Sequence, residues 1–126
     1  MWEVMWETAA RALLLVNGAY DLVCAISIAA DRCYPFSHLH TDMFADREVF
    51  RDAARRNLLA HWILLNGLVR LAAGARPAFI AVAACTYLLE IHCLSSMHHE
   101  LVLWKHRGVV ALSLACAALS FASVFS

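Results

Sequence analysis

Four long apolar blocks, separated by polar segments, dominate the hydrophobic pattern of the chain. Each is rich in Ala, Leu and Val, and together they cover about residues 9–30, 57–75, 78–97 and 108–125. About 20 helical residues cross the roughly 30 Å hydrocarbon core of a bilayer, and a single span must be helical to satisfy its backbone hydrogen bonds. The pattern therefore predicts an all-α, polytopic membrane protein: one domain, 1–126, in which four transmembrane helices form an antiparallel bundle.

The composition supports a membrane protein over a soluble bundle. Of the 126 residues, 63% are hydrophobic and 16% are charged, whereas soluble domains are nearer half apolar and a quarter charged. The last block, GVVALSLACAALSFASVF, has no charge on any face, although a helix of a soluble bundle needs a polar stripe. The formal net charge is zero, so no nucleic-acid partner is expected.

Four spans place both termini on one side of the membrane and the long polar loop, about 31–56, on the other. The loop side also holds the segment before the last span, and its basic residues are Arg32, Arg47, Arg51, Arg55, Arg56, Lys105 and Arg107. By the positive-inside rule this side faces the cytoplasm, a matrix or a stroma. Within the loop, DMFADREVFRDAARRNLLAHW predicts an amphipathic helix that Asp42 or Asp46 caps and that runs into the second span or lies in the interface.

Six polar residues fall inside the apolar blocks. Counting a rise of about 1.5 Å per residue places Asp21, His61, Glu90 and His92 in one layer, in the half nearer the basic side. Asn17 and Arg70 fall in the opposite half. We expect a structural cluster that locks the helices together through three pairs: Asp21 with His61, Glu90 with His92 or Tyr87, and Asn17 with Arg70.

Catalytic and ligand-binding alternatives have weaker support. Intramembrane carboxylates and histidines can mark a metal or proton site, and His61 with His92 is the one pair suited to a bis-histidine haem or a pigment. A zinc site from His38, His40, His98 and His99 is conceivable, although nothing in the sequence fixes its geometry. No phosphate loop, nucleophile elbow or HExxH motif occurs. We therefore expect no enzyme activity, no metal and no resident cofactor, and contacts with lipids instead.

A short motif carries a resemblance to a known family. The second span reads RRNLLAHWILLNGLVRLAAG, in which Arg56 precedes Trp62 and Arg70 follows Trp62 by eight positions. Glu100 follows Arg70 by thirty positions and leads into LVLWKH. Over roughly 55–107 this resembles the ergosterol biosynthetic protein 28 family of small four-span membrane proteins. The chain departs from the family at Arg56, which stands one position off the family's first Arg, and at Ser96, where the family has His. It also departs before Trp62, where Leu-Ala-His replaces Thr-Phe-Gly.

The resemblance implies a non-catalytic scaffold of the endoplasmic reticulum that tethers sterol-synthesising enzymes, with other integral membrane proteins and membrane lipids as partners. Small residues in the last span favour an alternative, an accessory transmembrane subunit of a large respiratory or photosynthetic complex in the mitochondrial inner or a plastid membrane. A third interpretation is a haem- or pigment-binding redox subunit that uses His61 and His92.

Overall fold

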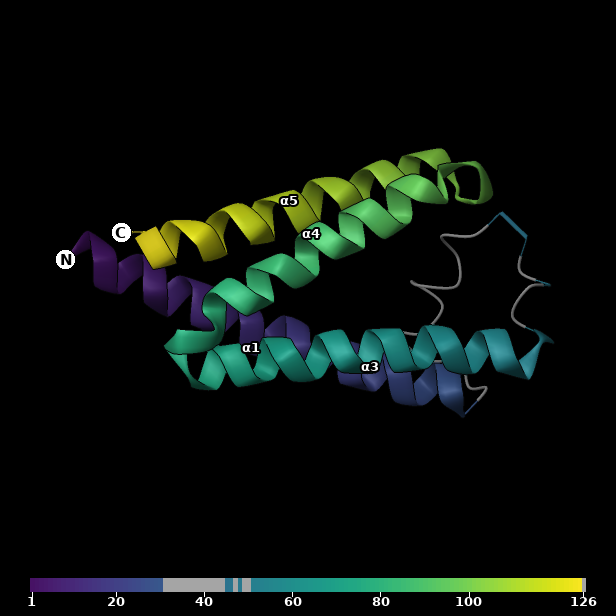
Figure 1. Cartoon of the computed structure of the whole chain (residues 1–126), viewed down its shortest axis with the longest axis horizontal. Coiled ribbons are helices and arrows are strands. Elements are labelled where there is room, and N and C mark those ends of the chain that lie inside the picture. The colour runs from purple at the N-terminus through teal and green to yellow at the C-terminus, as the bar shows by residue number, and fades with distance from the viewer. Residues whose placement is uncertain (31–44, 47, 49–50, 126) are drawn as a thin grey trace.

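A computed structural model describes residues 1–30, 45–46, 48 and 51–125 of the chain. Within them it contains four long helices and two short 3₁₀ turns, Pro77–Phe79 and His98–Glu100 (Figure 1). The long helices are α1 (Trp2–Ala29), α3 (Ala53–Ala75), α4 (Ile80–Ser96) and α5 (Leu103–Phe125). Counting the turn at Pro77 with α4, all four are long and apolar enough to cross a membrane. The chain is an all-α four-helix bundle and an integral membrane protein.

The four predicted helices are confirmed, and three of them begin earlier than the apolar pattern indicates. α1 begins at Trp2, α3 at Ala53 and α5 at Leu103. Helices of this kind continue into the interfacial layer, where Trp and charged side chains are stable and the backbone still gains hydrogen bonds. In Figure 1 both chain ends lie at the same end of the bundle, as predicted.

The start of α3 differs from the predicted helix in the loop. Asp52 caps α3, because its side chain accepts a hydrogen bond of 3.1 Å from the backbone N–H of Ala54. Asp46 instead accepts the N–H of Glu48 at 2.9 Å, ahead of α3. Neither predicted cap therefore begins this helix. Asp42 and most of the predicted amphipathic helix lie outside the described residues.

α1 and α3 approach each other closely along a line of small residues. Buried positions of α3 recur in steps of three and four at Ala60, Ile63, Gly67, Arg70 and Gly74, the spacing of left-handed helix packing. A Cβ added at Gly18 of α1 would lie 2.8 Å from the carbonyl oxygen of Gly67. Only glycine permits this approach, so the two backbones meet directly at the middle of the pair.

The terminal end of the same pair is held by Arg11. Its Nε donates to the carbonyl oxygen of Gly74 at 2.9 Å, and Nη2 donates to that of Ala75 at 3.4 Å. The last carbonyls of a helix have no partner within the helix. Arg11 on α1 therefore satisfies the end of α3 and carries a positive charge to its negative dipole end.

An apolar core joins all four helices, with Tyr87 as its largest member. Its buried residues are Leu14, Ala73, Ile80, Ala83, Tyr87, Cys116 and Ala117. α4 and α5 lie side by side, and α4 crosses over the α1–α3 pair beside the turn at Pro77 (Figure 1). Tyr87 of α4 therefore lies in contact with this core, and it also borders the polar residues described next.

Candidate functional site

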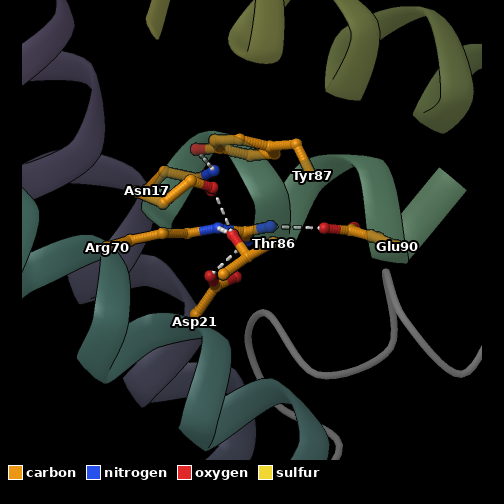
Figure 2. A network of polar contacts seen from close by, with 7 residues as sticks. Asn17, Asp21, Arg70, Thr86, Tyr87 and Glu90 are labelled. Carbon is orange, nitrogen blue, oxygen red and sulfur yellow. Dashed lines mark hydrogen bonds and ion pairs between the residues drawn. The ribbon is translucent and has the colours of Figure 1, made fainter. Parts of the chain in front are cut away.

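Arg70 lies at the centre of a charged network inside the bundle. Its side chain is 3% exposed, and three of its nitrogens donate to three side chains on two other helices. Nη1 donates to Oδ2 of Asp21 at 2.7 Å, Nη2 to Oε2 of Glu90 at 2.5 Å, and Nε to Oγ1 of Thr86 at 3.2 Å. Figure 2 shows the guanidinium between these partners. One cation thus links α1, α3 and α4.

Tyr87 and Asn17 complete the network on its other face. The Arg70 guanidinium carbon lies 3.9 Å from the centroid of the Tyr87 ring, a cation–π contact. Nδ2 of Asn17 donates to the Tyr87 hydroxyl at 2.6 Å. The hydroxyl of Thr86 donates in turn to the carbonyl oxygen of Ala83 at 2.7 Å. The arrangement satisfies the polar groups with partners from the same chain, as a low-dielectric interior requires.

Helix direction explains why these side chains meet. A Cα–Cβ bond leans toward the N-terminus of its own helix. α3 runs from the loop side to the terminal side, so Arg70 leans toward the loop side. α1 and α4 run the opposite way, so Asp21 and Glu90 lean toward the terminal side. The three side chains therefore converge although their Cα atoms start at different depths.

The network unites four of the six predicted polar residues, Asn17, Asp21, Arg70 and Glu90, and changes every predicted pair. Asp21 bonds Arg70 instead of His61, Glu90 bonds Arg70 instead of His92 or Tyr87, and Asn17 bonds Tyr87 instead of Arg70. The predicted pairs were wrong because they compared Cα depths alone. They left out the lean of each side chain and the reach of arginine.

His61 and His92 lie outside the network. Both residues are exposed, and Nδ1 of His61 lies 2.6 Å from the backbone carbonyl oxygen of Asn57, within its own helix. His61 occupies an outward position on α3, and His92 an outward position on α4. The predicted layer of Asp21, His61, Glu90 and His92 is therefore split between interior and surface, and the outward positions do not build a bis-histidine pocket.

The pattern of polar residues does not predict Thr86 as a member of the network, and it predicts Tyr87 only as a partner for Glu90. The position of the tight turn between α3 and α4 could have indicated Thr86. Arg70 precedes Pro77 by seven residues, and Thr86 follows Phe79 by seven. In an antiparallel hairpin, residues equally far from the turn lie at the same level. Folding the sequence about its Arg-Pro turn would have placed Thr86 beside Arg70.

The remaining candidate positions lie toward the loop end. Among the described residues, no group of three or more His, Cys, Asp or Glu is placed to hold a metal ion. Of the conceivable zinc ligands, His38 and His40 lie outside the described residues.

The family-motif positions do not form one site. Arg70 pairs with Glu90, whereas Glu100 lies in the turn before α5. The carbonyl oxygen of Glu100 accepts the N–H of Ala45 at 2.9 Å. Trp62 is 37% exposed, and Arg56 lies in the first turn of α3.

Comparison of the chain with protein-family models, curated proteins and solved structures gave no match.

Proposed function

We propose that the protein is a non-catalytic membrane scaffold that holds other integral membrane proteins through its outward helix faces. The observation that carries the proposal is the enclosure of the ion network. Arg70 uses three donor nitrogens on side chains of its own chain and is 3% exposed. A transport or catalytic site needs charged groups that meet a substrate, whereas these groups tie three helices together.

The outer faces of the helices favour contact with partner helices. α5 has the smallest buried share of the four spans, and Gly108 to Phe125 contains no charged residue. Ala111, Ala115, Ala118 and Ala122 all lie on exposed positions of this helix. Small residues in steps of three and four let another helix approach closely in a membrane, where packing drives association.

The identity of the partners rests on the resemblance over residues 55–107. It favours sterol-synthesising enzymes of the endoplasmic reticulum. The uncharged, small-residue face of α5 favours a second candidate, an accessory subunit that docks on the core of a respiratory or photosynthetic complex.

Purification of tagged protein from its native membranes, with mass spectrometry of what co-purifies, separates the two candidates. We expect sterol-synthesising enzymes in amounts comparable to the bait. Recovery of respiratory or photosystem core subunits without sterol enzymes would replace the first candidate by the second. Recovery of neither set above an unrelated four-span control would contradict both.

A matched pair of variants tests the docking face. Ala118→Leu adds bulk to the small-residue face of α5 and should lower recovery of the partner. Leu112→Ala changes an exposed side chain of the same helix that points about 90° away from the small-residue face. This control should leave recovery of the partner unchanged. Equal recovery with both variants would show that α5 does not use this face.

A further inference from the structure

The ion network contains more negative than positive charge. Asp21 and Glu90 each place a carboxylate oxygen on Arg70, so two formal negative charges face one positive charge. Among the residues that the structure describes, Arg70 is the one basic side chain paired with these carboxylates. A surplus charge inside a membrane bundle is costly, and the usual remedy is that the group binds a proton.

Among the described residues of the neighbouring helices, none supplies the missing positive charge. On α4 the side chains in contact with Arg70, besides Glu90, are Thr86 and Tyr87, both neutral at pH 7. α1 contributes Asn17, Tyr20 and Cys24, none of which is a base. The residues of α5 that are buried against the bundle are also uncharged: Ser113, Cys116, Ala117 and Ser120. The basic residues of α5 lie in its first turns, toward the loop end.

The two carboxylates differ in how far the bundle encloses them. The Asp21 side chain is 5% exposed, whereas that of Glu90 is 22% exposed. Asp21 is therefore the more enclosed carboxylate of the two and Glu90 the less enclosed one.

We propose that Asp21, Glu90 and Arg70 form a proton-binding site that holds one proton shared by the two carboxylates. The proton comes from water and converts one carboxylate to a carboxylic acid, which leaves the other carboxylate and the guanidinium as a neutral ion pair. Because the charges are coupled, the proton belongs to the pair of carboxylates rather than to either one. The site is independent of the partners proposed above.

Infrared spectroscopy of the protein in lipid nanodiscs tests the site directly. The carbonyl-stretch band of a protonated carboxylic acid, identified by its shift in D₂O, should be present at neutral pH and vanish at alkaline pH. Glu90→Gln and Asp21→Asn each remove one negative charge and keep the side-chain shape. Each substitution alone should therefore abolish the neutral-pH band, since the remaining carboxylate then balances Arg70.

Glu100→Gln is the control, because Glu100 lies in an exposed turn outside the network and its loss should leave the band intact. Helical circular dichroism and a single elution peak verify the fold of each variant. Absence of the band in the unmodified protein would overturn the proposal even if no variant folded. A band that survives in either single variant would also overturn it, because the proton would then not depend on the surplus charge. A band that appears or disappears with sodium or potassium at constant pH would replace the proton by a bound metal cation.

Discussion

Adding one methyl group at Gly18 tests whether α1 and α3 touch through their backbones. The new Cβ would lie 2.8 Å from the carbonyl oxygen of Gly67 and 2.9 Å from the backbone nitrogen of Leu71. Ordinary contacts begin at 3.4 Å, so the two backbones must separate by about half an ångström. A side chain could rotate away, but a backbone carbonyl in a helix cannot.

The expected magnitude of Gly18→Ala follows from two opposing terms. Overpacking a tight contact costs about 1–3 kcal/mol. Alanine recovers at most about 1 kcal/mol over glycine through its lower conformational entropy in the unfolded chain. We therefore expect a net loss of about 1–2 kcal/mol in the free energy of unfolding. Gly18→Val should cost more, because it also adds two methyl groups to the contact.

Unfolding by increasing SDS in dodecyl maltoside micelles, followed by circular dichroism and tryptophan fluorescence, measures this loss. Gly108→Ala is the matched control, because a Cβ there meets nothing within 4 Å. The control should unfold at the same or a higher SDS fraction than the unmodified protein. If Gly18→Ala unfolds together with Gly108→Ala, the close approach of α1 and α3 is refuted.

Three further substitutions test other contacts of the bundle by the same unfolding measurement. Arg70→Met removes the cation shared by the buried Asp21 and the partly buried Glu90 and should cost about 3–5 kcal/mol, and a variant that equals the unmodified protein would contradict the enclosed network. Tyr87→Phe removes the acceptor of Asn17 and should cost about 0.6 kcal/mol, an interhelical bond in a membrane. Asp52→Ala removes the cap of α3 and should cost about 1 kcal/mol, with faster hydrogen exchange confined to the first turn of α3.

The four spans could be predicted because each depends on local sequence alone. Length and apolar content decide whether a helix crosses a membrane, and both can be counted residue by residue. The membership of Asn17, Asp21, Arg70 and Glu90 in one polar cluster was also predictable, since polar side chains within spans must find partners inside the bundle. The same reasoning failed for His61 and His92, because the rotation of α3 and α4 turns them outward and the apolar content of a span does not determine that rotation.

By itself, then, the sequence determines that four helices cross the membrane, that the termini share a side, and that the charges of the spans must be paired. Only the tertiary structure decides that Arg70 is the common partner of Asp21 and Glu90. The reason is geometric: contacts between side chains on different helices depend on the direction of each helix, its rotation and the lean of its side chains. Gly18 and Gly67 set the spacing of α1 and α3 in the same way, through a backbone contact that becomes visible only when the helices are packed.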